Sequence, residues 1–143
     1  MLKQYKKTGF TEFKFFELLV ATLKNNENVS LIIKDNLEVA LFDLKNDEEL
    51  KPILKNLCFI DQLDNKRVDL NNAFLAANIG GLINRVHDSD AGKYIINISK
   101  EDAAIIVKNH DNVDVELMNK LVQKINSKYA CNENTEEGYV KKR

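Results

Sequence analysis

Proline, glycine, cysteine and tryptophan are scarce in this 143-residue chain, which has one, five, two and none of them. So few prolines and glycines exclude a collagen-like or proline-rich low-complexity protein. The two cysteines, Cys58 and Cys131, lack the spacing of a metal site, and an irregular pair fits a reducing cytosol better than a secreted disulfide scaffold. A disulfide between them is allowed but not required, and Cys58, within the apolar stretch Leu57–Ile60, is expected to be a small buried hydrophobe.

An excess of charge of either sign is also missing, since 21 Lys and Arg residues are balanced by 22 Asp and Glu residues. The net charge of −1 argues against bulk attraction to nucleic acid or to an anionic membrane. No window approaches the roughly 18 uncharged apolar residues of a membrane-spanning helix. The apolar run from Phe13 to Leu23 is interrupted by Lys14 and Glu17, so it is not a secretory signal core. We expect a cytoplasmic protein that does not enter a membrane.

The chain does have 44% hydrophobic and 30% charged residues, a composition typical of a globular domain. At about 150 residues per domain, its length corresponds to one domain. We expect residues 1–130 to form a single α+β domain, with about five helices packed on a small, mostly antiparallel sheet. Residues 131–143 lose all periodicity and are predicted to be a flexible C-terminal tail. Asparagine occurs 18 times and lysine supplies 18 of the 21 cationic residues, which hints at an AT-rich bacterial genome.

Three segments have the signals of helices. The segment 11–26 places its large apolar residues in an arc about 160° wide, which is wide enough to contact more than one neighbour. Ser99 begins a shorter helix over 99–109, with Asp102 in the capping-box position. Asp114 is expected to cap the last helix, 115–130, whose apolar arc is about 140° wide. The arcs contain Phe13, Phe15, Phe16, Leu19, Val20 and Leu23 in the first helix, and Leu117, Met118, Leu121, Val122, Ile125 and Tyr129 in the last.

Strand signals occur in two regions. Residues 93–98 are β-branched and aromatic, as is typical of a strand. Residues 29–34 and 37–42 flank Asp35-Asn36, a pair that tolerates positive φ, and together they predict a β-hairpin. The alternative for 37–42 is a helix, because its leucines also share a helical face with Leu44.

Conflicting signals come from residues 46 to 63. Asn46 and Glu49 have the spacing of a capping box, and apolar residues with helical spacing follow. Pro52 removes a backbone donor within that pattern, so the helix either begins near Pro52 or bends there. Residues 59–63 are ambiguous, with a short strand as one interpretation.

Asp69 is expected to cap a helix over residues 70–87. An apolar stripe follows one side, and a small-residue side contains Ala73, Ala77, Gly80 and Gly81. Each central glycine costs a helix about 1 kcal/mol, so we expect a close helix contact on the small-residue side, within the chain or across a two-fold axis. The rival interpretation is a break at Gly80-Gly81 with strands on both sides. The apolar stripe consists of Leu75, Ile79, Leu82, Ile83 and Val86.

Residues able to catalyse reactions or bind metals form no recognisable constellation. His87, Asp88 and Ser89 are adjacent, but catalytic triads assemble from separate elements. His87 and His110 are therefore interpreted as helix-end residues. Zinc motifs are lacking, and the calcium-like segment 88–92 has no matching later ligands. We expect no catalytic residue, no metal and no cofactor.

The main specific alternative is nucleic-acid binding through a helix-turn-helix-like segment at residues 99–130. Its second helix would present residue types that read base edges or phosphates. Against this interpretation, Asp114 and Glu116 open the would-be recognition helix and would repel phosphate, and the chain is not basic. The candidate contact residues are Asn119, Lys120, Gln123 and Lys124.

We therefore expect a non-catalytic protein-interaction or regulatory module that binds a protein partner or itself. The expectation depends on the lack of catalytic motifs, the balanced charge, and helices whose apolar or small-residue area exceeds one contact. The small-residue side at Ala73, Ala77, Gly80 and Gly81 is the predicted contact.

The clean apolar face of the helix at 115–130 gives a direct test. Leu121→Asp should unfold the protein or make it insoluble, because that face would have to bury a carboxylate. Thermal denaturation and solubility of the purified variant measure this. A soluble variant with an unchanged melting temperature would contradict the placement of Leu121.

Overall fold

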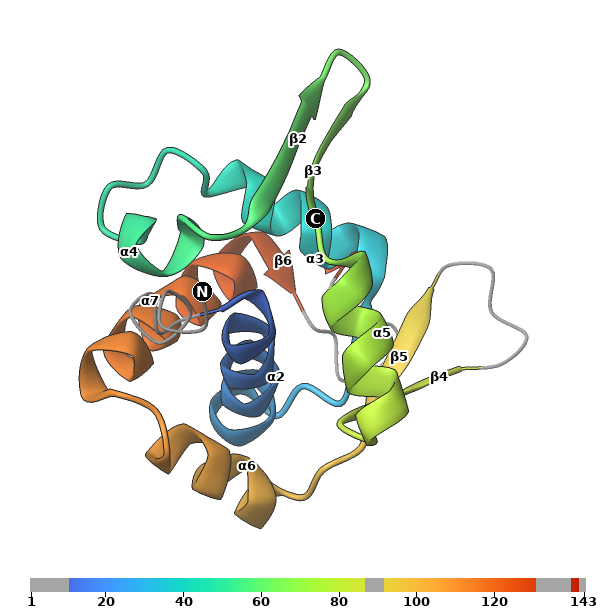
Figure 1. The fold of residues 1–143 in the computed structure, drawn as a ribbon, viewed down its shortest axis with the longest axis vertical. Coiled ribbons are helices and arrows are strands. Elements are labelled where there is room, and N and C mark those ends of the chain that lie inside the picture. The colour runs from blue at the N-terminus through green and yellow to red at the C-terminus, as the bar shows by residue number, and fades with distance from the viewer. Residues whose placement is uncertain (1–10, 87–91, 131–139, 142–143) are drawn as a thin grey trace, which may run out of the picture.

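The computed structural model describes residues 11–86, 92–130 and 140–141, with side chains described for 11–86 and 92–125. Within these residues it contains six helices, a three-stranded antiparallel sheet and two two-stranded ribbons (Figure 1), which confirms the α+β prediction. In chain order the elements are α2 (Glu12–Glu27), β1 (Leu31–Ile33), α3 (Lys34–Asp43), α4 (Lys51–Leu54), β2 (Cys58–Gln62), β3 (Asn65–Asp69), α5 (Asn71–Gly80), β4 (Ile83–Arg85), β5 (Lys93–Ile96), α6 (Lys100–Lys108), α7 (Asn112–Lys128), β6 (Tyr129–Ala130) and β7 (Val140–Lys141).

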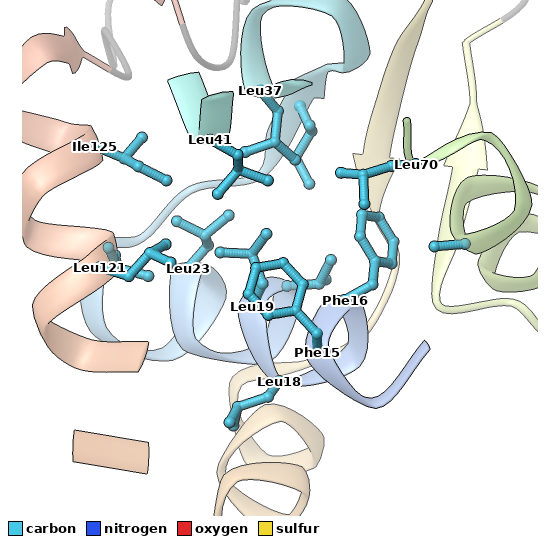
Figure 2. Packing of buried hydrophobic residues seen from close by; sticks show 14 of the residues in the cluster. Phe15, Phe16, Leu18, Leu19, Leu23, Leu37, Leu41, Leu70, Leu121 and Ile125 are labelled. Atoms are coloured by element: carbon cyan, nitrogen blue, oxygen red, sulfur yellow. The ribbon is translucent and has the colours of Figure 1, made fainter. Parts of the chain in front are cut away.

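Helix α2 lies at the centre of the molecule (Figure 1), and helices α5, α6 and α7 all contact it. In Figure 2, Leu19 and Leu23 point toward α3 and α7, whereas Leu18 points to the opposite side. A helix that is apolar on nearly all sides has to be enclosed. The predicted helix at 11–26 is confirmed, and of its apolar arc only Phe13 is exposed. The buried residues of α2 are Phe15, Phe16, Leu18, Leu19, Val20, Ala21, Thr22 and Leu23.

The three-stranded sheet has the order β1-β5-β4, with antiparallel pairs on both sides of β5. Helix α5 packs on one face of it, since the rings of Phe74 and Tyr94 have centroids 4.8 Å apart. The predicted strand at 93–98 is thus confirmed as the central strand. The buried positions on the face that α5 covers are Ile32, Ile83 and Ile96.

The β2–β3 hairpin extends away from the helices (Figure 1). A two-stranded hairpin is marginally stable by itself, and this one is anchored on α3 and the chain that follows it. The rings of Phe42 and Phe59 meet edge to face at 6.2 Å. The carboxylate of Asp61 pairs with Lys66 at 2.6 Å and with Lys45 at 2.9 Å. These hydrogen bonds lower the pKa of Asp61 to about 2.

The hairpin predicted around Asp35-Asn36 is wrong, and the alternative helix for 37–42 is present as part of α3. Leu37 and Leu41 are fully buried, whereas Val39 between them is 37% exposed. In a strand these three side chains would share one face, so the burial pattern is helical. Asp35 lies in the first turn, where the helix dipole favours a carboxylate.

The helix predicted over 70–87 is correct only as far as Gly80. Gly81 has a φ of 86° and donates its N–H to the carbonyl groups of the last turn. A glycine in this left-handed conformation ends a helix, and Ile83 is then buried from a strand rather than from a helix. The rival interpretation, a break at Gly80-Gly81 with a strand on each side, is therefore correct for the strand after the break. It is wrong for the residues before the break, which form a helix.

The predicted helix starts differ in accuracy. Ser99 is the N-cap of α6, and its Oγ accepts from the N–H of Asp102 at 3.0 Å, as the sequence indicates. Helix α7 begins at Asn112, earlier than predicted, so Asp114 lies in its first turn instead of capping it.

The region from 46 to 63 resolves into a short helix and a strand. Helix α4 begins beside Pro52, which is one of the two alternatives that the sequence left open. The capping box at Asn46 is wrong, because it is Asp47 whose Oδ1 accepts from the N–H of Leu50 at 3.3 Å. The short strand is confirmed as β2, and its partner β3 is a strand that no sequence pattern predicts.

The predicted C-terminal tail falls largely outside the described residues. Within that segment, Val140 and Lys141 form β7 and pair with Tyr129 and Ala130 of β6.

A buried carboxylate joins α3 to the chain around the start of α5. Glu38 is fully buried, and its Oε1 lies 2.8 Å from Arg67 Nη1 on β3. Its Oε2 pairs with Lys34 at 3.1 Å and accepts from the N–H of Leu70 at 2.9 Å. Arg67 also contacts Asp35 at 3.2 Å. Both oxygens of Glu38 are thus partnered, as a buried charge requires.

Three carboxylates converge on the N-terminus of α5, whose N-cap residue provides no side-chain cap. The first N–H groups of a helix lack partners within it and carry partial positive charge. Because two of these carboxylates come from α2 and α3, the orientation of α5 is set by tertiary contacts. Glu38 accepts from the N–H of Leu70 at 2.9 Å and Asp69 accepts from the N–H of Asn71 at 3.0 Å, while the backbone N–H of Ala73 lowers the pKa of Glu12.

Removal of the buried carboxylate of Glu38 should destabilise the folded protein. We expect Glu38→Ala to lower the free energy of unfolding by about 3 kcal/mol, because it leaves Arg67, Lys34 and the N–H of Leu70 without their buried partner. Asp35→Ala is the matched control, since Asp35 also pairs with Arg67 but is 64% exposed, and it should cost less than about 1 kcal/mol. Urea denaturation measures both, and equal losses would contradict the role assigned to Glu38.

Glu12 gives a pH-dependent prediction. Burial and the neighbouring Asp69 raise the pKa of Glu12 above 4.5, although the hydrogen bond from Ala73 lowers it. The folded protein therefore binds this proton more tightly than the unfolded chain, and stability falls as the pH rises through the raised pKa. Between about pH 4 and about pH 7, Glu12→Gln should gain stability relative to the wild type. Glu48→Gln, at a side chain that is 82% exposed, should show no such gain in urea denaturation.

Candidate functional site

The outward face of α5 is the most distinctive surface among the described residues. Leu75 is 60% exposed and Ile79 is 77% exposed, one helical turn apart. None of the ten residues of α5 is charged, although charged residues make up 30% of the chain. We call this surface the α5 face, and its exposed residues are Asn71, Asn72, Leu75, Ala76, Ile79 and Gly80.

Small residues lie beside the two hydrophobic side chains of the α5 face. Ala76 and Gly80 are four residues apart and therefore lie on the same side of the helix. A Cβ atom added at Gly80 would meet nothing within 4 Å. The backbone of α5 can thus be approached closely at this end.

The helix that carries this face is fixed to the sheet as well as to α2 and α3. The Oδ1 atom of Asn78 accepts from the backbone N–H of Arg85 in β4 at 3.1 Å. On the inner side of α5, the rings of Phe74 and Phe16 have centroids 4.6 Å apart. The α5 face is therefore presented by a helix held at its start, along its inner side and near its end.

The predicted apolar stripe does not form one continuous surface. Leu75 and Ile79 are exposed on α5, whereas Ile83 is buried from β4. The predicted periodicity continues across Gly81, but the chain changes from helix to strand after this residue, which moves the later apolar residues to other positions. In the sequence, the feature that indicates this exposed hydrophobic face is the lack of any charged residue in 71–80.

The four small residues predicted as a contact do not form one surface. Ala73 and Ala77 are buried in the core of this chain. Gly80 is exposed and Gly81 is partly exposed, and an added Cβ at either would meet nothing within 4 Å. The described chain therefore makes no close backbone contact at the glycines, and Gly81 serves to end the helix.

The residues of the nucleic-acid alternative lie on α7, and three of them have partners within the molecule. Lys120 pairs with Glu49 at 2.6 Å, and this hydrogen bond raises the pKa of Lys120. Lys124 pairs with Asp47 at 2.5 Å and thereby lowers the pKa of Asp47. The remaining two are Asn119, which accepts from Asn26 at 2.7 Å, and Gln123, which is exposed.

Because of these ion pairs, the positive charges of Lys120 and Lys124 on α7 are balanced by carboxylates of the same molecule. Asp47 and Glu49 come from the segment before α4, far from α7 in sequence, so sequence periodicity could not reveal them. Their carboxylates lie beside the ammonium groups that would have to contact phosphate. Helices α6 and α7 do form the two helices expected in 99–130, and both pack on α2.

Of the two histidines, His110 lies in the part of the chain that the structure describes. His110 Nε2 lies 3.4 Å from Glu17 Oε1, in a pair between α2 and the loop before α7. His87, Asp88 and Ser89 lie outside the described residues. No group of three or more His, Cys, Asp or Glu side chains could hold a metal ion in residues 11–86 and 92–125.

Cys58 is an exposed free thiol at the start of β2, so the prediction that it is buried is wrong. Cys58 stands opposite Asp69 in the β2–β3 ladder, at the end of the hairpin that joins the rest of the chain. Cys131 lies outside the described residues.

Within the described chain, no helix has the length and apolar character needed to span a bilayer. Comparisons with protein-family models, with curated proteins and with solved structures give no match to this chain.

Proposed function

We propose that the protein is a non-catalytic protein-interaction module and that the α5 face is its docking surface. The observation that supports this is the exposure of Leu75 and Ile79 on a helix without charge. Covering a large aliphatic side chain contributes roughly 1.5–3 kcal/mol. Because no charged group of α5 has to be desolvated, little of that gain is lost.

Other exposed hydrophobic side chains do not provide a comparable surface. Leu63 is 95% exposed but stands between Gln62 and the charged Asp64 at the tip of the β2–β3 hairpin. Ile105 on α6 and Val113 on α7 are single exposed residues in helices with several charges. Among the described residues, α5 alone carries two large exposed hydrophobes one turn apart, and scattered single ones are ordinary.

The pairing on α7 favours protein binding over nucleic-acid binding. A phosphate at Lys120 or Lys124 would have to displace the carboxylates of Glu49 and Asp47. Since phosphate contacts dominate the affinity for nucleic acids, paired lysines make a weak site.

We propose that the interaction takes place in the cytoplasm of a bacterium. The exposed free thiol of Cys58 fits a reducing compartment. The asparagine- and lysine-rich composition fits an AT-rich genome.

Charge introduced on the α5 face should abolish binding without unfolding the protein. We expect Leu75→Lys and Ile79→Lys to change the free energy of unfolding by less than about 0.5 kcal/mol, because both side chains are exposed. Each variant should lose the proteins, including further copies of itself, that the immobilised wild type retains from a lysate of its host. Leu63→Lys, at an even more exposed leucine, is the matched control and should retain them. The same retained proteins for all four chains would contradict the proposal.

A further inference from the structure

We propose that the occupant of the α5 face is a second copy of this chain, bound through a two-fold symmetric contact between the two α5 helices. This inference rests on the proposed function and names its partner. The charge, the hydrogen-bonding groups and the shape of the α5 face all suit such a contact.

The charge of the surface suits a copy of itself. At a two-fold contact the same patch meets itself, so any charge near the axis faces its own copy and repels it. α5 has no charge at any of its ten positions. A partner that is recognised through opposite charge would have no charged group on α5 with which to pair.

The polar residues at the start of α5 are also self-complementary. Asn71 and Asn72 are exposed, and an asparagine amide both donates and accepts hydrogen bonds. Two copies of one asparagine can therefore bond to each other, which two copies of a lysine or glutamate cannot. The molecule already contains such a pair, since Asn26 donates to Asn119 at 2.7 Å.

The shape of the α5 face lets two helices approach. Leu75 and Ile79 form a ridge, and Ala76 and Gly80 form a low row beside it, each pair with a spacing of four residues. Ridges of one helix pack into the grooves of another, so the ridge of each copy fits the low row of the other. Gly80 leaves open the space into which the partner's side chain would pack.

The size of the surface sets the strength of the contact. A helix of ten residues is about 15 Å long, so the contact is smaller than that of a permanent dimer. The expected state is a reversible dimer with a dissociation constant in the micromolar range or weaker.

Analytical ultracentrifugation of the full chain tests this directly, from about 1 µM to about 500 µM protein. The wild type should change from monomer to dimer with concentration. Ile79→Lys should weaken dimerisation by about tenfold or more, because two ammonium groups would meet near the axis. Leu63→Lys should dimerise like the wild type. A wild type that stays monomeric throughout, or a dimer that Ile79→Lys does not weaken, overturns the proposal.

Cross-linking locates the contact. In a Cys58→Ser, Cys131→Ser background, Ala76→Cys should be joined into a covalent dimer by a short bis-maleimide, and Leu63→Cys should not. Equal cross-linking of the two variants also overturns the proposal. If the wild type is monomeric but its binding of other proteins still depends on Leu75 and Ile79, the docking surface stands and only the identity of its occupant is wrong. If neither self-association nor binding depends on them, both proposals fail.

Discussion

The enclosure of α2 is the constraint on which the rest of the structure depends. Eight of its residues are buried, on all sides of the helix, so the chain has to supply neighbours in every direction. Helices α5, α6 and α7 provide them, and Leu37 and Leu41 of α3 add to the same core (Figure 2). A single central helix of this kind makes the surrounding elements interdependent, because each covers part of the same apolar surface.

The polar network around Glu38 fixes elements that pack around α2. It joins α3, β3 and the start of α5 through one buried carboxylate with three partners. Apolar contacts alone permit a helix to slide or rotate, whereas hydrogen bonds to the first N–H groups of α5 fix both its position and its direction. The α5 face is therefore displayed at a defined place on the molecule by carboxylates from elements distant in sequence.

The sequence was most informative where local signals agreed. For α2, α6, α7 and β5, periodicity, caps or β-branched residues pointed to one structure, and each was found. It was least informative at two places. Asp35-Asn36 resembles a turn, but these residues lie in helix α3, which buries Leu37 and Leu41. Gly81 ends a helix in the middle of an apolar pattern. The helix of the candidate site was recognised, but its exposed side was not, because Leu75 and Ile79 have the spacing of core residues. Pairs such as Lys124 with Asp47 depend on tertiary structure and leave no mark in a periodic pattern.

The hydrogen bond between Asn78 and Arg85 has a consequence for how copies of the molecule can join. Strand β4 is at the border of the three-stranded sheet, where an open backbone donor invites another chain to extend the sheet. The side chain of Asn78 occupies that donor from the neighbouring helix. Growth by strand addition into open-ended filaments is disfavoured at this border, while a symmetric helix contact is complete once two copies have met.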